Sequence, residues 1–241
     1  MNVAPLLGVV AGGATLVGAH AVARNARTRL ATIELLVCFS AGFMIALSLA
    51  GAVPESFARD PLGAAPVILL GYLLVHLSQH TFTRHFHFGE ETHVVSREAS
   101  RSAVAGLALH TFFDGVAIAS GFLVSPALGV LFFVAIALHK LPEGVAVASL
   151  VLASGGTARG CYYAAAFMGL ATVLGVILTD VSGTLSHYGL PLSAGVTLYV
   201  GASNLVPEFQ QRRGWKTPLA FFAGAVAFLA SQALIQRLAI G

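Results

Sequence analysis

The sequence contains the runs His110-Thr-Phe-Phe-Asp114-Gly115 and His139-Lys140-Leu-Pro142-Glu143-Gly144, and each run lies in the middle of a long apolar segment. In both runs a histidine precedes a carboxylate by four residues, so the two side chains share one face of a helix. A charged group at the centre of a membrane helix costs about 2.5–3.5 kcal/mol on insertion scales, so such groups face a bundle interior, a partner or an ion. Two imidazoles and two carboxylates from neighbouring helices form an N2O2 set that suits a divalent transition metal.

The composition indicates a membrane protein. Of the 241 residues, 57% are hydrophobic and only 10% are charged, and the mean hydropathy is +0.85. We therefore predict an all-α polytopic protein with a single transmembrane domain over residues 1–241. The net charge of +3 is spread over short loops, so nucleic acid is not an expected partner. Cys38 and Cys161 fall in or beside apolar runs, which argues against a structural disulfide or a cysteine-based zinc site.

Apolar runs of roughly 20 residues match a hydrocarbon core about 30 Å thick. We predict eight spans, at residues 3–23, 31–53, 62–82, 101–123, 126–153, 158–180, 189–208 and 217–238. The first of these is expected to be a retained helix, because no basic region precedes it. The polar segments between the spans are expected to be loops, including the long His-rich loop 83–100 and the segment 180–191.

The distribution of basic residues predicts the orientation of the chain. Lysine and arginine favour the cytoplasmic side. With both termini outside the cytoplasm, the outer side holds only Arg59 and Arg237, while Lys140 lies within the membrane. The inner loops then hold Arg24, Arg27, Arg29, Arg84, Arg97, Arg101, Arg159, Arg212, Arg213 and Lys216. The sequence therefore predicts extracytoplasmic termini and a cytoplasmic His-rich loop, in a cell membrane or inner membrane.

An internal repeat relates the second and seventh predicted spans. The segment 40–55 aligns without gaps on 193–208, with Ser-Ala-Gly at one end and Val-Pro-Glu at the other. The two spans cross the membrane in opposite directions in the predicted topology, so the copies are inverted and the fold is a 3+2+3 arrangement. Such inverted repeats are typical of secondary transporters with a binding site near the midplane. Chance similarity between two Ala/Gly-rich helices is the alternative.

The fourth and fifth spans are expected to form the site near the midplane. His110 is about the tenth residue of its span, roughly 15 Å into the membrane at 1.5 Å per residue. The short connection makes the two spans antiparallel neighbours, and Pro142 is expected to kink the fifth span because it cannot donate a backbone hydrogen bond. Each histidine taken alone could instead be a buried residue bonded to a neighbouring helix.

Lys140 allows two interpretations. It could extend toward the membrane surface or pair with Asp114 or Glu143 as a structural residue. Alternatively, its ammonium occupies the position of a second cation. Two carboxylates contribute −2, Lys140 contributes +1 and a divalent ion contributes +2, so this interpretation predicts one transported ion per site.

The motifs HxxxDG and HKxPEG, with Leu-Tyr-Val and Val-Pro-Glu in the seventh span and the eight-span plan, resemble the ZIP family of zinc and iron transporters. The resemblance covers nearly the whole chain, and Phe133–Lys140 is most similar to the branch with lysine after the fifth-span histidine. It implies a metal site at His110, Asp114, His139 and Glu143. It also implies homodimers and an elevator-like motion, in which spans one, four, five and six slide against the others.

Some positions depart from the family pattern. Thr111 stands where many relatives have Asn, and Thr172 aligns loosely with a sixth-span Glu of relatives with two metals. Relatives with two metals carry an acid, Asn or Gln at the position of Lys140, so Lys140 and Thr172 together weaken the second metal site. Met44 matches a second-span thioether found near the entrance in some relatives, although an isolated methionine is more often a packing residue.

Further histidines lie near the predicted inner loop. His85 and His87, with Glu90 and Glu91, could bind zinc weakly and deliver or sense it. The alternative is an exposed polar loop without a metal role. His76 and His80 are four residues apart on the third span and could form another ligand pair.

We expect a transporter that moves Zn²⁺ into the cytoplasm, with no bound cofactor and no enzymatic activity. An N2O2 set also accepts Fe²⁺, Mn²⁺, Co²⁺ and Cd²⁺, and uptake should fall at acid pH because the ligands must be deprotonated. A proton-coupled transporter of a small organic solute is the first alternative. An intramembrane metalloprotease is less favoured, because Thr111 and Lys140 stand where a His-Glu-x-x-His motif would need its glutamate.

Overall fold

A computed structural model describes residues 3–24, 30–82, 97–207 and 214–240 of the chain, and every regular element in these ranges is a helix. The predicted all-α class is confirmed. The elements are α1 (Ala4–Arg24), α2 (Leu30–Ala46), η1 (Leu47–Ala52), α3 (Val53–Arg59), α4 (Ala64–Phe82), α5 (Arg97–Val124), α6 (Pro126–Ala153), α7 (Ala158–Val181), α8 (Gly183–Tyr199), η2 (Val200–Leu205) and α10 (Lys216–Ile240). The elements η1 and η2 are π-helical.

The π-helical elements form continuous rods with their neighbours: η1 joins α2 to α3, and η2 extends α8. The backbone N–H of Val53 donates to the carbonyl of Ser48, and that of Val206 donates to Gly201, so each bond spans five residues. A proline follows directly in both cases, at positions 54 and 207. Because proline lacks an N–H, it cannot continue the ordinary bond to the residue four before it. Pro142 differs, since α6 passes through it as an α-helix.

Six helices among the described residues are long and apolar enough to cross a membrane. They match the predicted spans 3–23, 31–53, 101–123, 126–153, 158–180 and 217–238. The spans predicted at 62–82 and 189–208 are not among the six, although α4 covers 64–82 and α8 with η2 covers 189–205. The predicted loop 180–191 is wrong: α8 begins at Gly183, because the Ser182 side chain accepts a hydrogen bond from the N–H of Leu185 and starts a new helix.

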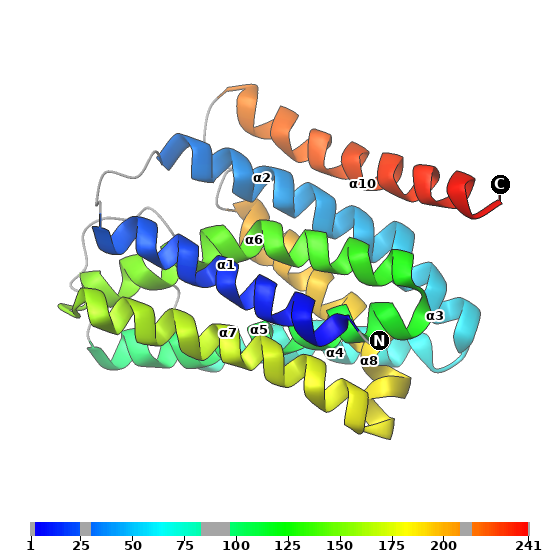
Figure 1. The fold of residues 1–241 in the computed structure, drawn as a ribbon, viewed down its shortest axis with the longest axis horizontal. Helices are drawn as coiled ribbons and strands as arrows, with labels where there is room; N and C mark the ends of the chain where they lie inside the picture. The colour runs from blue at the N-terminus through cyan, green and yellow to red at the C-terminus, as the bar shows by residue number, and fades with distance from the viewer. Residues whose placement is uncertain (1–2, 25–29, 83–96, 208–213, 241) are drawn as a thin grey trace.

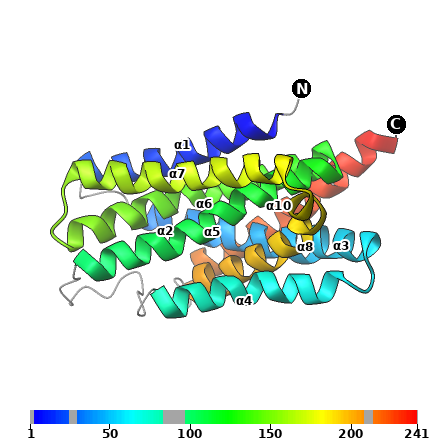
Figure 2. The same ribbon diagram turned by 90° about the horizontal axis from the view of Figure 1, so that it is seen from below.

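The helices form two groups (Figure 1). The first group contains α1, α5, α6 and α7, which pack extensively on one another, and the second group contains the pairs α2·α10 and α4·α8. Figure 2 shows α1 and α7 on one side of the bundle, α4 on the other side, and α5 and α6 between them. The start of α1 and the end of α10 lie toward the same end of the bundle.

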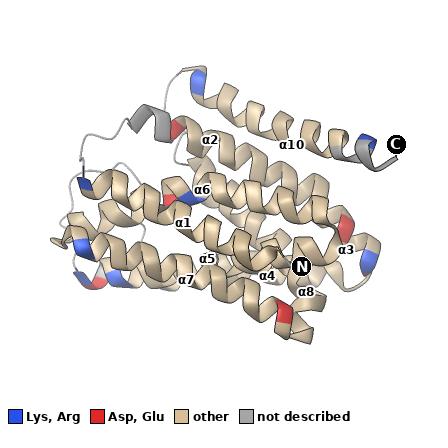
Figure 3. Cartoon of the chain, in the orientation of Figure 1, with Lys and Arg blue, Asp and Glu red and all other residues tan. Residues whose placement is uncertain are grey.

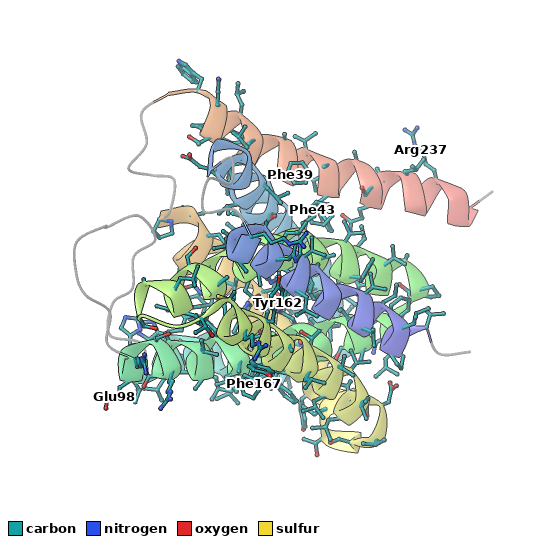
Figure 4. All side chains as sticks on the ribbon, turned by 60° about the vertical axis from the view of Figure 1, so that its left-hand side comes forward. Phe39, Phe43, Glu98, Tyr162, Phe167 and Arg237 are labelled. Carbon is teal, nitrogen blue, oxygen red and sulfur yellow. The ribbon has the colours of Figure 1, made fainter. Side chains whose placement is uncertain are left out.

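Phenylalanine side chains fill the contact between α2 and α10. Figure 4 labels Phe39 and Phe43 on α2. The rings of Phe43 and Phe228 meet edge to face with their centroids 5.6 Å apart. Edge-to-face contacts of this kind add to the stability that apolar burial already provides.

Paired glycines bring neighbouring helices into backbone contact. A Cβ on Gly18 would strike the carbonyl of Leu141 in α6, and a Cβ on Gly144 would strike the carbonyl of Thr15 in α1. Other helix pairs meet in the same way through Gly12 with Gly169, Gly115 with Gly175, Gly121 with Gly129, Gly42 with Gly224, and Gly71 with Gly195. Small residues at such positions let membrane helices approach closely, where van der Waals packing replaces the hydrophobic effect.

All of these glycine pairs lie within one of the two groups. Among the described residues, the glycines that face the other group meet side chains instead: Gly51 in η1 faces Leu128 in α6, and Gly189 in α8 faces Ser120 and Val116 in α5. Glycine contacts therefore join the helices of the first group backbone to backbone, and they do the same within the pairs α2·α10 and α4·α8, whereas these two glycines at the boundary between the groups meet side chains.

Two glycines of α1 provide a matched test of this packing. Gly18→Ala should destabilise the protein by about 1–3 kcal/mol, because the added methyl group must push α1 away from α6. Gly13 has no atom of another element within 4 Å of the position of a Cβ, so Gly13→Ala should be neutral or stabilising by up to about 1 kcal/mol through helix propensity. Thermal unfolding in detergent measures both variants. Equal melting temperatures would contradict the role assigned to the glycine contact.

Candidate metal site

The connection between α5 and α6 places the two polar runs side by side. Ser125 caps α6 by accepting a hydrogen bond from the N–H of Leu128, 3.1 Å away, and Pro126 occupies the first turn. The single linking residue forces the two helices to run antiparallel. Close contact between Gly121 and Gly129 then holds the helices together near the turn. Lys140 and Glu143 are the charged residues of α6 and lie near the middle of its length. Figure 3 shows the blue and red stretches of α6 away from the ends of the bundle, where most other charges lie.

The predicted set His110, Asp114, His139 and Glu143 converges at this level, and one ligand atom of each lies within 4.8 Å of all the others. Nε2 of His110 is 3.4 Å from Oδ2 of Asp114 and 3.9 Å from Oε2 of Glu143. Nε2 of His139 is 3.3 Å and 3.8 Å from the same two oxygens. Ligand atoms around a tetrahedral zinc ion are about 3.3–3.5 Å apart, given metal–ligand bonds of about 2.0–2.2 Å. The four nitrogen–oxygen distances are within about half an ångström of that geometry, and all four ligand atoms lie within 4.8 Å of one another.

The cluster is enclosed by protein. The exposed fractions of the four side chains are 3% for His110, 2% for Asp114, 3% for His139 and 8% for Glu143. Burying two ionised carboxylates without compensation is costly, so positive charge must balance them while they stay ionised. The predicted convergence is therefore present in the structure, and the charge of the cluster demands a positive partner.

Lys140 supplies a positive charge inside the cluster. Its Nζ lies 2.8 Å from Oδ2 of Asp114 and 2.8 Å from Oε2 of Glu143, and its side chain is fully buried. Extension of this lysine toward the membrane surface is wrong, because the ammonium is drawn inward to both carboxylates. The other structural alternative, pairing with Asp114 or Glu143, is observed with the carboxylate oxygens of both residues. Those oxygens are the same atoms that face the two histidines.

Two further residues orient the cluster. The hydroxyl of Thr111 donates to Oε1 of Glu143 at 3.0 Å and accepts from Nζ of Lys140 at 3.1 Å. Nδ1 of His139 donates to the carbonyl of Ala135 at 3.1 Å, so the lone pair of the neutral ring lies on Nε2, on the side of the carboxylates. Sequence reasoning missed Ala135, although its position one helical turn before His139 was a usable signal. Nδ1 of His110 is buried and has no hydrogen-bond partner in the described part of the chain.

The remaining predicted residues lie elsewhere or outside the description. Met44 is buried in the apolar core with Phe43 and Leu47, which agrees with its alternative role in packing. Thr172 is buried in α7, and its hydroxyl donates to the carbonyl of Met168 at 3.4 Å. His85 and His87 fall outside the described residues.

His76 and His80 lie together on α4. Their ring centroids are 4.0 Å apart, and Nδ1 of His80 donates to the carbonyl of His76 at 2.9 Å. The ring of His76 also meets that of Tyr199 in α8, with the centroids 5.7 Å apart. The possible ligand role of the two histidines stays a prediction.

The chain is similar to known zinc transporters. The family model described as ZIP zinc transporter matches residues 97–232, more than half of the chain. Zinc transporter YKE4 of Saccharomyces cerevisiae is 24% identical over 221 residues, which cover 77% of this chain. The chain spans 63% of the length of that relative.

Two threonines test the role of Thr111. Thr111→Val removes the hydroxyl that links Glu143 to Lys140, and it should weaken zinc binding about 10–100-fold, the usual effect of losing a group that orients a metal ligand. Thr172→Val is the matched control, because that hydroxyl bonds to a carbonyl of its own helix turn, at Met168. Zinc titration of the purified protein in detergent measures both affinities. An equal loss in the two variants would refute the orienting role.

Proposed function

The chain belongs to the ZIP zinc transporter family, a family of transporters rather than enzymes, and from this premise we propose that it carries divalent transition metals across a membrane into the cytoplasm. Zn²⁺ is the proposed main substrate, with His110, Asp114, His139 and Glu143 as its ligands. The observation that carries the proposal is the convergence of these four buried side chains from two neighbouring helices, with nitrogen–oxygen distances of 3.3–3.9 Å. Fe²⁺, Mn²⁺, Co²⁺ and Cd²⁺ are further candidate substrates, because an N2O2 set binds them as well.

The two alternatives fit the cluster less well. A metalloprotease needs a glutamate beside the metal as general base, but the residue after each histidine is Thr111 or Lys140, and Lys140 is bound to both carboxylates. A proton-coupled carrier of an organic solute needs groups that bind the solute. The cluster instead offers four converging ligand atoms of the kind that a metal ion uses.

We further propose eight spans in a 3+2+3 inverted repeat. The alignment of 40–55 on 193–208 carries η1 onto η2 residue for residue, so both copies change to π-helix at the same place. Continued without a gap, it carries Gly42 onto Gly195 and Gly71 onto Gly224. The repeat therefore maps the contact between Gly42 and Gly224 onto the contact between Gly195 and Gly71. The rods α2–η1–α3 and α8–η2 also run in opposite directions along the bundle (Figure 1).

The division of the helices into two groups supports an elevator-type motion. The first group, α1, α5, α6 and α7, holds the metal cluster and corresponds to spans one, four, five and six. Glycine contacts join its members backbone to backbone, whereas Gly51 and Gly189, which face the other group, meet side chains. Because its helices are held together more closely than they are held to the second group, the first group can move as one rigid unit relative to the second. We also propose that the protein is a homodimer and that both termini are extracytoplasmic. The start of α1 and the end of α10 lie toward the same end of the bundle, which agrees with termini on one side of the membrane.

Metal uptake into liposomes tests the ligand assignment. His110→Ala and Glu143→Ala each remove one ligand atom and should lower zinc uptake by about tenfold or more, the effect of about 1.4 kcal/mol in transition-state energy. The matched controls are His187→Ala and Glu98→Ala, because both side chains are exposed and lie outside the cluster; Figure 4 labels Glu98 at the start of α5. If His110→Ala and Glu143→Ala carry zinc as well as the parent protein, the site is assigned wrongly.

The number of ions per site tests the role of Lys140. In the Lys140→Asp variant a carboxylate replaces the ammonium, so the cluster should bind two zinc ions where the parent binds one. Equilibrium titration gives the stoichiometry, with His85, His87 and His93 replaced by alanine in both proteins to remove binding outside the cluster. A single ion in the Lys140→Asp variant would contradict the idea that the ammonium fills the second cation position.

A further inference from the structure

Lys140 is bound in a way that bears on how the carrier returns without its cargo. Its Nζ contacts Asp114 Oδ2, both carboxylate oxygens of Glu143, and Thr111 Oγ1, at distances between 2.8 and 3.1 Å. The side chain is fully buried, and its stem starts from the helix that also carries His139 and Glu143. The ammonium is thus a fixed part of the cluster that moves wherever the ligands move.

The ammonium and a metal ion can be held at the same time. Asp114 Oδ2 and Glu143 Oε2 face the two imidazoles at 3.3–3.9 Å, and each carboxylate oxygen has lone pairs for more than one partner. A metal on the imidazole side uses one set of lone pairs, and Nζ keeps the other. Lys140 therefore need not leave the cluster when an ion binds.

With Lys140 in place, the net charge of the cluster has the same magnitude whether the site is empty or holds a divalent ion. With both imidazoles neutral, the two carboxylates and Lys140 give the empty site a charge of −1, and a divalent ion changes it to +1. Without the ammonium the loaded site would be neutral and the empty site would carry −2. The cost of moving charge through a low dielectric grows with the square of that charge. Lys140 therefore removes the most costly state, which is the empty site with a charge of −2.

We propose that Lys140 is a tethered counter-ion that allows the empty carrier to reorient, so that net metal uptake needs no second cation to accompany the return step. This inference rests on the proposed transport function. It makes Lys140 a positioning residue for the cycle and not a metal ligand. The step that depends on it is the movement of the empty site, while movement of the loaded site does not need it.

Comparing net uptake with exchange separates these two steps. Net uptake of radioactive zinc into zinc-free liposomes requires the carrier to return empty, whereas exchange against unlabelled zinc inside the vesicles does not. In Lys140→Gln the empty site carries −2, so the ratio of exchange to net uptake should rise about tenfold over that of the parent. Lys140→Arg keeps the positive charge, and its ratio should stay near the parent value.

Two further measurements make the test specific to charge. In the Lys140→Gln/Glu143→Gln double variant the empty site returns to −1, so at saturating zinc the ratio should fall back toward that of the parent. An inside-negative membrane potential favours outward movement of the empty negative site, and it should speed net uptake more in Lys140→Gln than in the parent.

Several outcomes would overturn the inference. They are an unchanged ratio in Lys140→Gln, an equal rise in Lys140→Gln and Lys140→Arg, or loss of zinc binding by Lys140→Gln in detergent. Failure of the parent protein to carry zinc at all would instead refute the proposed function, so the two failures are distinguishable.

Discussion

The arrangement of this protein depends on one constraint: two carboxylates are held inside a membrane-spanning bundle, where unbalanced charge is costly. Asp114 and Glu143 lie on neighbouring antiparallel helices, and their oxygens converge on Lys140 at 2.8 Å and on two imidazoles at 3.3–3.9 Å. One ammonium balances only half of that negative charge. The remaining negative charge would attract a further cation, as the proposed metal site requires.

The packing of the bundle serves this constraint. Each histidine-carboxylate run ends in a glycine, and Gly115 and Gly144 are the points where α5 touches α7 and α6 touches α1 backbone to backbone. The helices α5 and α6 are therefore packed closely against α7 and α1 at the level of the cluster. A close-packed outer layer keeps lipid and water away from the cluster, and in a low dielectric each charge interaction inside it is stronger.

Much of this could be predicted from the sequence, because the strongest signals are local. Apolar length gave six of the spans, and the spacing of His110 and Asp114, repeated at His139 and Glu143, gave the cluster. Other features depend on contacts between distant residues and have no local signal. The pairing of Gly42 with Gly224 is one such feature, and the inward direction of Lys140 is another. The segment 180–191 was misread because its serine, glycine and proline residues are typical of loops, yet Ser182 caps a helix there. The π-helical turns had only Pro54 and Pro207 as a signal, and a proline alone does not distinguish a π-helical turn from a kink.

The donor set also bears on which ions the cluster can hold. Mg²⁺ and Ca²⁺ prefer six or more oxygen ligands, and Mg²⁺ keeps several waters. His110 and His139 offer nitrogen, and both are almost fully buried, which leaves little room for a hydrated ion. Lys140 and Thr111 occupy the outer side of the carboxylates, so expansion to six oxygen ligands is blocked there as well. At the proposed site the lysine would thus keep the coordination number of a bound ion small, which would favour an ion that accepts imidazole ligands in a tetrahedral arrangement over the alkaline-earth ions.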